Sequence, residues 1–557
     1  MRPSEVTGVG FDPELSYARG ARTPVLLEET IGANLDQTIA RYGDREALVS
    51  CQQGTRLTYA QLGAAVDELA RGLIAVGLAP GDRLGIWSPN RVEWTLVQYA
   101  TAKLGVILVN INPAYRTSEL EYVMRQSGCR MLIAAPVFKT SDYRSMVTEV
   151  RPALTELERV VFLDGPEWDD LLASAAEVAE DELAARGAEL APGDAINIQY
   201  TSGTTGFPKG ATLTHSNLLN NGFMVGEGCR YTEADRVCIP VPFYHCFGMV
   251  LGNLACTSHG AAMVIPAPAF EPEATLSAVA TERCTSLYGV PTMFIAQLDH
   301  PRFDEFDLES LRTGVMAGSP CPVEVMRRVI ERMHMSEVGI CYGMTETSPV
   351  STQTAFDDPL EKRVGTVGRV VPHVEIKVVD ASGETVPRGE SGELCTRGYS
   401  VMLGYWNDPE RTREAIDEDA WMHTGDLAEM DADGYVNIVG RIKDMVIRGG
   451  ENLYPREIEE FLYGHPDIAD VQVIGVPDQR YGEELMAWII ARKGTSLDRE
   501  QIEGYCRGKI AHHKIPRYVK LVDAFPMTVT GKVQKFKLRE LAVEKLDLGA
   551  SASVKTA

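Results

Sequence analysis

Residues 200–209 read YTSGTTGFPK and directly follow an apolar run, AINIQ, at 195–199. The apolar run predicts a strand, and the loop after it combines glycines, small hydroxyl residues and one lysine. Backbone N–H groups and hydroxyls in such a loop can converge on phosphate oxygens, and Lys209 adds a compact positive charge. The stretch therefore predicts a phosphate-binding loop, although a plain surface loop rich in Ser, Thr and Gly has a similar composition.

The spacing of the glycines separates this loop from the Walker A loop. A Walker A loop has four residues between its glycines and a Lys-Ser or Lys-Thr pair directly after the second. Here only two threonines separate Gly203 from Gly206, and Pro208 precedes the lysine. A proline lacks an N–H donor and disfavours the helical conformation for the residue before it. We therefore expect a phosphate loop that does not run straight into a helix N-terminus.

The composition of the whole chain indicates a globular protein of more than one domain. A chain of 557 residues exceeds the length that one ordinary core holds. Its 54 Lys and Arg against 78 Asp and Glu give a net charge of −24, which disfavours nucleic acid and anionic membranes as partners. Residues 507–539 reverse this balance, with nine basic residues and one acid, Asp523. That segment is typical of a face that meets a polyanionic ligand.

Common targeting and metal-binding patterns are missing from the sequence. The first twenty residues lack the layout of a secretory signal or a transit peptide, and no apolar run reaches membrane-spanning length. The eleven cysteines include no C-x-x-C pair, so we expect reduced thiols in a cytoplasm. The ten histidines show neither H-E-x-x-H nor zinc-finger spacing, and on these patterns we expect no zinc site.

Alternating helix-like and strand-like segments predict an α/β fold. Up to about residue 440, helical periods alternate with short apolar runs, as at 58–77, 83–88 and 105–111. Residues 168–187 are acidic and rich in alanine, which predicts one solvated helix. Asp433 and Gly434 predict a hairpin turn between two strands. A compact αβ unit follows, so we expect a domain boundary near 440–444.

Four further motifs follow the phosphate loop in order: YGMTETS at 342–348, HTGD at 423–426, GRIKDMVIRGGENLYPREIE at 440–459 and PMTVTGKVQK at 526–535. With the loop, they resemble the signatures of the adenylate-forming superfamily, which contains acyl-CoA synthetases, adenylation domains and luciferases. The similarity spans nearly the whole chain. Residues 451–489 look most like medium- to long-chain fatty acyl-CoA synthetases.

The resemblance implies a fold and a reaction. The fold is a large N-terminal domain of layered α/β subdomains with a β-barrel-like part (1–440), a hinge (441–444), a small mobile C-terminal α+β domain (445–545) and a disordered tail (546–557). The reaction is the ATP-dependent conversion of a medium- to long-chain fatty acid to acyl-AMP with release of pyrophosphate, followed by transfer to coenzyme A. The expected ligands are ATP, Mg²⁺, coenzyme A and a fatty acid. A homodimer is one expected oligomeric state.

The same resemblance implies roles for individual residues. Lys532 is expected to bridge the acyl carboxylate and the α-phosphate as the main catalytic residue, while Glu346 and Thr201 hold Mg²⁺ and take part in catalysis. Asp426 is expected to hold the ribose hydroxyls, and Arg441 to contact ribose or phosphate. The other expected nucleotide contacts are Ser202, Gly203, Thr204, Thr205, Gly206, Lys209, Gly318, Ser319, Tyr342, Gly343, Met344 and Thr345.

On the acyl side, the resemblance implies contacts from four residues, which are His245, Phe247, Val290 and Gly318. Lys443 matches the hinge position, where many relatives carry Asp. Gly449 and Gly450 match the face that approaches the pantetheine arm of coenzyme A, because glycines permit a close backbone approach. Taken alone, His245 would more often be a packed core histidine and Lys532 a flexible surface charge.

Other functions stay open at this stage. The same adenylation could serve a different carboxylic acid or a different acceptor, such as a carrier protein or the oxygen used by luciferases. An ATP phosphotransferase would release ADP instead of AMP and pyrophosphate. A silent nucleotide-binding scaffold would do neither, since a fold does not guarantee a function. The acyl chain length depends on how Met249, Val250 and Val290 pack, and the sequence leaves it open.

Overall fold

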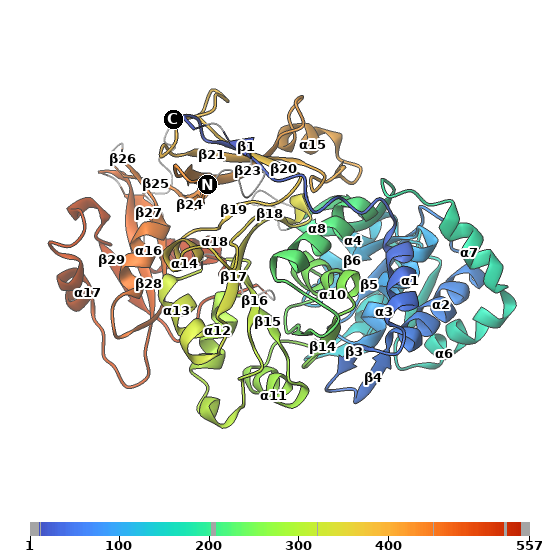
Figure 1. The fold of residues 1–557 in the computed structure, drawn as a ribbon. Coiled ribbons are helices and arrows are strands. Elements are labelled where there is room, and N and C mark those ends of the chain that lie inside the picture. The colour runs from blue at the N-terminus through green and yellow to red at the C-terminus, as the bar shows by residue number, and fades with distance from the viewer. Residues whose placement is uncertain are drawn as a thin grey trace.

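The computed structural model describes residues 10–11, 13–201, 208–319, 321–448, 451–478, 480–528 and 532–546 (Figure 1). Three large sheets belong to the part before residue 442, and a fourth belongs to the C-terminal part. A short two-stranded ribbon joins β8 (Val137–Phe138) and β9 (Ser141–Asp142). Within the described residues, no helix is long and apolar enough to cross a membrane. The mixed α/β class expected from the sequence is confirmed.

The first sheet has seven strands, and the predicted phosphate loop connects the fifth and sixth of them. Its five leading strands are mutually parallel, and the last two run antiparallel to their neighbours. Their short runs of Val, Ile and Leu are typical of strands buried on both faces. In spatial order the strands are β10 (Arg159–Phe162), β7 (Met131–Ala134), β5 (Arg83–Trp87), β6 (Ile107–Asn110), β11 (Ala195–Thr201), β12 (Lys209–Thr214) and β22 (Gly404–Tyr405).

The second sheet has nine strands and carries the YGMTETS motif. Its central six strands are parallel, and antiparallel strands form both edges. In spatial order the strands are β19 (Arg369–Val370), β18 (Val350–Gln353), β17 (Glu337–Gly343), β16 (Thr313–Ala317), β15 (Ser286–Gly289), β13 (Arg236–Cys238), β14 (Ala262–Ile265), β3 (Glu46–Ser50) and β4 (Thr55–Thr58).

Helices join these two sheets into one apolar core. The largest buried cluster contains residues of both sheets and of many helices, among them α1 (Ile31–Tyr42), α2 (Tyr59–Ala75), α3 (Val92–Leu104), α8 (His215–Gly228) and α10 (Ala255–His259). A second cluster packs the other face of the seven-stranded sheet against α4 (Thr117–Ser127) and α5 (Tyr143–Val150). Further helices of this part are α11 (Pro272–Glu282), α12 (Pro291–Leu298), α13 (Val323–Arg332), α14 (Leu360–Gly365) and α15 (Pro409–Ala415).

The third sheet is antiparallel and lies above the other two in Figure 1. Its order is β1 (Gly10–Phe11), β2 (Tyr17–Arg19), β20 (Val374–Val379), β21 (Gly392–Gly398), β23 (Met422–Met430) and β24 (Val436–Arg441), so β1 and β24 form its edges. The resemblance implies a β-barrel-like part, whereas the described strands of this antiparallel sheet form an open sheet. The predicted hairpin turn is confirmed, because Met430 pairs with Val436 and Gly434 has φ +83°.

The C-terminal part forms a separate unit beside the nine-stranded sheet, in orange and red in Figure 1. Its sheet contains β25 (Val446–Arg448), β26 (Glu451–Leu453), β27 (Ile468–Asp478), β28 (Gly482–Ala491) and β29 (Tyr518–Leu521). Two apolar clusters of its own pack this sheet against α16 (Pro455–Tyr463), α17 (Arg499–Cys506) and α18 (Lys535–Lys545). A separate core is what an independently moving domain requires.

The acidic segment at 168–187 differs from its prediction as one solvated helix. It contains the end of α6 (Pro166–Ala173), a 3₁₀ turn at Ser174–Glu177 and most of α7 (Glu180–Ala188). Val178 is extended and buried between the helices. Trp168 and Leu171 are also buried, against the core that contains α2. The helix breaks because burying these apolar side chains outweighs the helical preference of the alanines.

Candidate functional site

The predicted phosphate loop joins two antiparallel strands. Thr201 at the end of β11 pairs with Lys209 at the start of β12. The Lys209 ammonium lies 4.8 Å from the centre of the Tyr405 ring, on β22. The predicted contacts within the loop lie outside the described residues: Ser202, Gly203, Thr204, Thr205 and Gly206. The expectation that the loop does not enter a helix directly is confirmed, because β12 follows it.

A buried carboxylate stands beside this loop. Glu346 lies in the 3₁₀ turn Thr345–Thr347, which follows β17, and its side chain is buried. Its Oε1 accepts hydrogen bonds from the Thr201 hydroxyl at 3.3 Å and from the Tyr405 hydroxyl at 2.9 Å. A carboxylate in the low dielectric of a protein interior is costly unless it is hydrogen-bonded or paired with a cation. This carboxylate therefore has two donors and is placed to accept a cation.

A second buried carboxylate belongs to the HTGD motif. Asp426 Oδ2 accepts a hydrogen bond from the Tyr342 hydroxyl at 2.7 Å, and Oδ1 accepts from Arg441 Nε at 3.0 Å. Gly425 has φ +71°, a conformation that favours glycine, and the ladder of β23 is irregular here. The kink turns the Asp426 carboxylate toward β17 and the end of β24. Three residues predicted from separate motifs are thus brought together.

The C-terminal unit contributes Lys532 to the same place. A Cβ built on Gly318 would lie 3.7 Å from Lys532 Cε and 3.1 Å from Val290 Cγ1, so the three residues are neighbours. Gly318 has φ +91°, which explains why glycine occupies this turn after β16. The lysine, the glycine turn and the predicted acyl-side valine therefore meet.

The surroundings of Lys532 lower the pKa of its ammonium group. Burial lowers its pKa, and the positive charge of Arg441 adds to this effect. The carboxylates of Asp426 and Glu346 act in the opposite direction and raise it. Lys532 thus lies within electrostatic reach of both buried carboxylates.

His245 lies near this lysine, whose charge acts on the imidazole. Its Nδ1 accepts a hydrogen bond from the Phe247 N–H at 3.2 Å, at the start of the short helix α9 (Cys246–Gly248). A six-residue π-helix, Met249–Leu254, follows, and π turns inside helices are frequent at functional sites. Burial lowers the pKa of His245 to about 3, and the charge of Lys532 contributes. The imidazole is therefore neutral at physiological pH.

We expect His245 to make folding stability depend on pH. An imidazole in the unfolded chain, with its ordinary pKa of 6.5, binds a proton over a pH range in which the native imidazole, with a pKa of about 3, does not. Its contribution to stability is complete above pH 6.5 and is lost as the pH falls from there toward 3, at up to about 1.4 kcal/mol per pH unit. Urea unfolding from pH 7 to 4 should show a shallower loss in His245→Asn than in wild type. Equal slopes would contradict this assignment.

The remaining predicted residues surround these groups or lie outside the described chain. Gly343 is required by packing, because a Cβ there would lie 1.6 Å from the carbonyl oxygen of Pro349. Ser319 follows Gly318, and Met344 and Thr345 begin the turn that carries Glu346. Lys443 is exposed in the 3₁₀ turn Ile442–Asp444, directly after β24. Gly449 and Gly450, predicted to face coenzyme A, lie outside the described residues.

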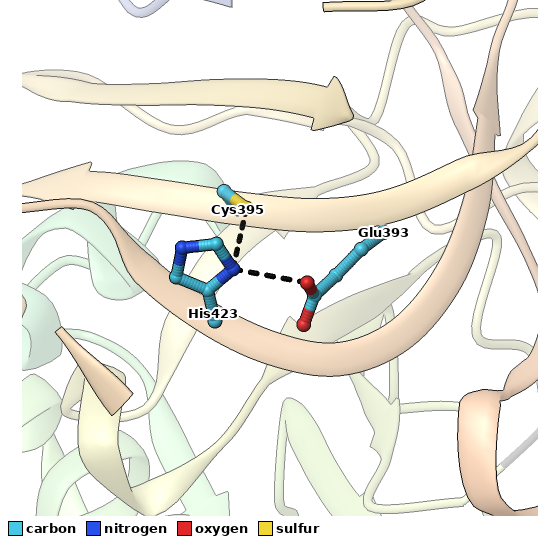
Figure 2. Close-up of side chains that lie close together, drawn as sticks. All are labelled: Glu393, Cys395 and His423. Carbon is cyan, nitrogen blue, oxygen red and sulfur yellow. Dashed lines mark hydrogen bonds and ion pairs between the residues drawn. The ribbon is translucent and has the colours of Figure 1, made fainter. Parts of the chain in front are cut away.

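Sequence reasoning missed two partners of the predicted carboxylates. Tyr405, on the short strand β22, donates to Glu346 and faces Lys209, and it belongs to none of the sequence motifs. Glu393 supports the HTGD turn, since its Oε1 accepts from the Gly425 N–H at 2.9 Å and its Oε2 lies 2.9 Å from His423 Nδ1 (Figure 2). No local spacing could have revealed either contact, because each joins segments at least 30 residues apart in the sequence.

The arrangement of these groups defines a class of protein. The N-terminal body holds two buried carboxylates, Glu346 and Asp426, and the small C-terminal unit brings Lys532 within electrostatic reach of both, an arrangement typical of adenylate-forming enzymes. Residues 35–406 match the model of the AMP-binding enzyme family, and residues 457–532 match that of the AMP-binding enzyme C-terminal domain. The chain belongs to the AMP-binding enzyme family. The family and the enzyme class expected from the sequence are confirmed.

Relatives and solved structures match nearly the whole chain. A Bacillus subtilis protein named as an acyl-CoA synthetase, YngI, is 50% identical, with 94% of this chain and 99% of that protein covered. The mouse mitochondrial medium-chain acyl-CoA ligase ACSF2 is 44% identical, with 96% of this chain and 91% of the mouse protein covered. The anthranilate CoA ligase AuaEII in complex with anthranoyl-AMP is similar in structure, with a TM-score of 0.85, 28% identity and 94% and 99% of the chains covered. ATP-bound MatB from Rhodopseudomonas palustris has a TM-score of 0.82 and 30% sequence identity, with 93% of this chain and 99% of MatB covered.

Proposed function

We propose that this enzyme is a fatty acyl-CoA synthetase of the AMP-forming type. The acid's carboxylate oxygen attacks the α-phosphorus of ATP, which forms acyl-AMP and releases pyrophosphate. The thiol of coenzyme A then attacks the acyl carbonyl, so that a C–S bond forms and the bond to AMP breaks. The observation that carries this proposal is the position of Lys532, a residue of the C-terminal unit that neighbours Gly318 and Val290 of the N-terminal body.

The first half-reaction needs positive charge where negative charge spreads over the phosphoryl oxygens. Lys532 is the cation placed for this role, within reach of both carboxylates. Asp426 would accept hydrogen bonds from the ribose hydroxyls, because an ionised carboxylate is an acceptor only. Arg441, paired with Asp426, fixes that carboxylate and would contact ribose or phosphate. The described stems of the loop, Thr201 and Lys209, would border the departing pyrophosphate.

The donor set around Glu346 fits Mg²⁺. This ion prefers hard oxygen ligands and usually takes one or two carboxylates together with substrate phosphates. The buried Glu346 carboxylate and the Thr201 hydroxyl, 3.3 Å apart, offer such oxygens. When bound, Mg²⁺ would neutralise charge on the triphosphate. The chain's own contribution is the position of the carboxylate, which Tyr405 holds by its hydrogen bond.

A chain of buried aromatic residues supports medium acyl chains. Val290 faces Gly318, and Tyr288 lies two residues earlier at β15, its ring 5.6 Å from the stacked ring of Phe247. The Tyr288 hydroxyl accepts a hydrogen bond from the Tyr231 hydroxyl at 2.9 Å, which fixes a polar, well-packed wall. The mouse relative is named as a medium-chain acyl-CoA ligase, which supports the same range, so we infer a preference for medium-chain acids.

We expect Tyr288→Ala to lengthen the preferred acid. Removing the ring opens space beyond Val290, and one methylene accommodated or excluded in an apolar pocket changes kcat/KM by about 10- to 200-fold. The ratio of kcat/KM for twelve-carbon over eight-carbon acids should therefore rise by about 10-fold or more. Tyr288→Phe keeps the ring and serves as the matched control, with little change in the ratio. Thermal melting verifies that both variants fold. An unchanged ratio in Tyr288→Ala would place the end of the acyl site elsewhere.

One assay tests the proposed function as a whole. A panel of carboxylic acids is offered with ATP and Mg²⁺, and pyrophosphate is measured with and without coenzyme A. We expect AMP and pyrophosphate with fatty acids, and acyl-CoA only when coenzyme A is present. ADP as the product would instead support a phosphotransferase, and acyl-AMP without thioester would support another acceptor. A cytoplasmic location, the hinge at 441–444 and a homodimer stay predictions.

A further inference from the structure

Three different metal-ligand groups meet on the antiparallel sheet, apart from the residues proposed to bind nucleotide, acid or thiol. Glu393 and Cys395 lie on β21, and His423 lies on the neighbouring β23. Figure 2 shows the imidazole of His423 between the thiol of Cys395 and the carboxylate of Glu393. Nδ1 of His423 lies 3.5 Å from Cys395 Sγ and 2.9 Å from Glu393 Oε2. The three ligand atoms all lie within 4.8 Å of one another.

These distances are close to those of a tetrahedral zinc site. Zn²⁺ lies about 2.3 Å from a thiolate sulfur and about 2.1 Å from imidazole nitrogen or carboxylate oxygen. Tetrahedral geometry then separates nitrogen from sulfur by about 3.6 Å and nitrogen from oxygen by about 3.4 Å. The first separation matches the structure, and the second requires the carboxylate to move by about half an ångström. The strand register holds the nitrogen–sulfur pair in place, because Cys395 and His423 are directly opposite each other.

Neighbouring groups orient two of these ligands as in known metal sites. His423 Nε2 lies 3.6 Å from Asp417 Oδ2, so the ring nitrogen that does not face the cluster has a carboxylate partner. A ligating histidine nearly always has such a partner on its other nitrogen. Glu393 Oε1 is held by the Gly425 N–H, which leaves Oε2 directed at the cluster. Cys395 is buried, whereas the side chains of Glu393 and His423 are 22% and 32% exposed, so an ion can reach the cluster.

We propose that Glu393, Cys395 and His423 form a zinc-binding site whose fourth position is taken by water. Binding forms one bond each to Sγ, Nδ1 and Oε2. The thiol proton of Cys395 leaves to solvent, and the neutral imidazole carries its proton on Nε2, toward Asp417. The site lies beside the turn that carries Asp426, and an occupied site ties β21 to β23 at that turn. Zinc therefore stabilises the fold next to the nucleotide site, independently of which acid the enzyme uses.

This proposal differs from the expectation of no zinc site, which rests on spacing patterns along the sequence. Known zinc motifs place ligands a few residues apart on one segment. Here the third ligand is 28 residues beyond Cys395, on the adjacent strand. The pairing of the two strands brings the three ligands together, and a spacing pattern along the chain cannot predict that pairing.

Cobalt binding to the full, tag-free chain tests the site. Co²⁺ takes the place of Zn²⁺ and gives a thiolate-to-metal absorption band only when a cysteine is a ligand. We expect one equivalent of Co²⁺ to produce this band, and one equivalent of Zn²⁺ to abolish it and raise the thermal midpoint. His423→Gln should weaken Zn²⁺ binding in a competition titration at least 10-fold. Asp417→Asn removes the negative charge 3.6 Å from His423 Nε2, so it should keep the band and weaken Zn²⁺ binding by about 10-fold.

Two cysteine variants decide whether the band comes from this site. Cys395→Ser should lose it, while Cys51→Ser, which removes the exposed thiol, should leave it unchanged. If the band survives in Cys395→Ser or disappears in Cys51→Ser, the metal binds elsewhere and the proposal is wrong. Absence of any band or midpoint shift in wild type with excess metal overturns it as well. Should Cys395→Ser fail to fold, the band in folded His423→Gln decides the matter: a full band at unchanged affinity is incompatible with the site.

Discussion

Lys532→Ala is expected to lower the rate of acyl-AMP formation by about 10²- to 10³-fold, or roughly 3 to 4 kcal/mol in the barrier, the loss seen when a positioned donor to a developing oxyanion is removed. The lysine reaches the site from the C-terminal unit and neighbours the turn at Gly318. Its ammonium is the group available there to balance the phosphoryl charge. ATP binding should persist, because the other described residues proposed to contact the nucleotide belong to the N-terminal body. Pyrophosphate release measures the loss, and ATP titration measures retained binding.

The variant should still convert preformed acyl-AMP and coenzyme A to acyl-CoA. This separates the two half-reactions, since transfer to the thiol does not need charge at the α-phosphate during attack. Lys520→Ala is the matched control, because Lys520 is an exposed lysine on β29 of the same unit and should leave both half-reactions unchanged. Equal loss of both half-reactions in Lys532→Ala would count against the division of roles. It would point instead to a structural part for the lysine.

The order of the motifs allowed the class of fold and most of the site to be predicted, because each motif combines a turn with the residue that the turn presents. Gly318 and Gly425 have positive φ, and the sequence marks such positions by their glycines. The partners that hold the presented residues were not predictable. Tyr405 reaches Glu346 only because β22 pairs with β12 beside the phosphate loop. Contacts of this kind depend on sheet order, which no local pattern encodes.

Tertiary contacts also explain the acidic segment at 168–187 and the cluster of Glu393, Cys395 and His423. Residues 168–187 have the composition of a solvated helix, but their apolar members find buried positions and break it at Val178. Glu393 reads as a surface acid in a strand, yet it is the hydrogen-bond partner of both the Gly425 N–H and His423. In both cases tertiary packing decides which side chains meet, and neither helix propensity nor spacing along the chain predicts these contacts. Binding sites formed by polar side chains on neighbouring strands are therefore the sites that sequence patterns most easily miss.

Glu346→Gln is expected to lower adenylation by about 10²-fold or more at physiological Mg²⁺, and to shift the Mg²⁺ concentration needed for half-maximal rate upward. The substitution keeps the shape and one acceptor for the hydroxyls of Thr201 and Tyr405. It removes one unit of negative charge from the place where a cation would sit beside the triphosphate. Because the amide is a much weaker Mg²⁺ ligand than a carboxylate, higher Mg²⁺ should recover part of the rate. Pyrophosphate release across a Mg²⁺ titration measures both effects.

Tyr405→Phe is the control that separates the charge of the Glu346 carboxylate from the hydrogen bond that holds it. It removes a hydrogen bond to the same carboxylate but leaves the charge, so its half-maximal Mg²⁺ concentration should stay near that of wild type, with a loss of rate of about 10-fold at most. If the Thr201 hydroxyl is a weaker ligand, the half-maximal Mg²⁺ concentration of Thr201→Val should lie between those of Tyr405→Phe and Glu346→Gln. If Glu346→Gln and wild type respond to Mg²⁺ identically, Glu346 does not hold the ion. Its burial between Thr201 and Tyr405 would then serve to fix the base of the phosphate loop, and the metal ligand would have to be sought among the substrate phosphates alone.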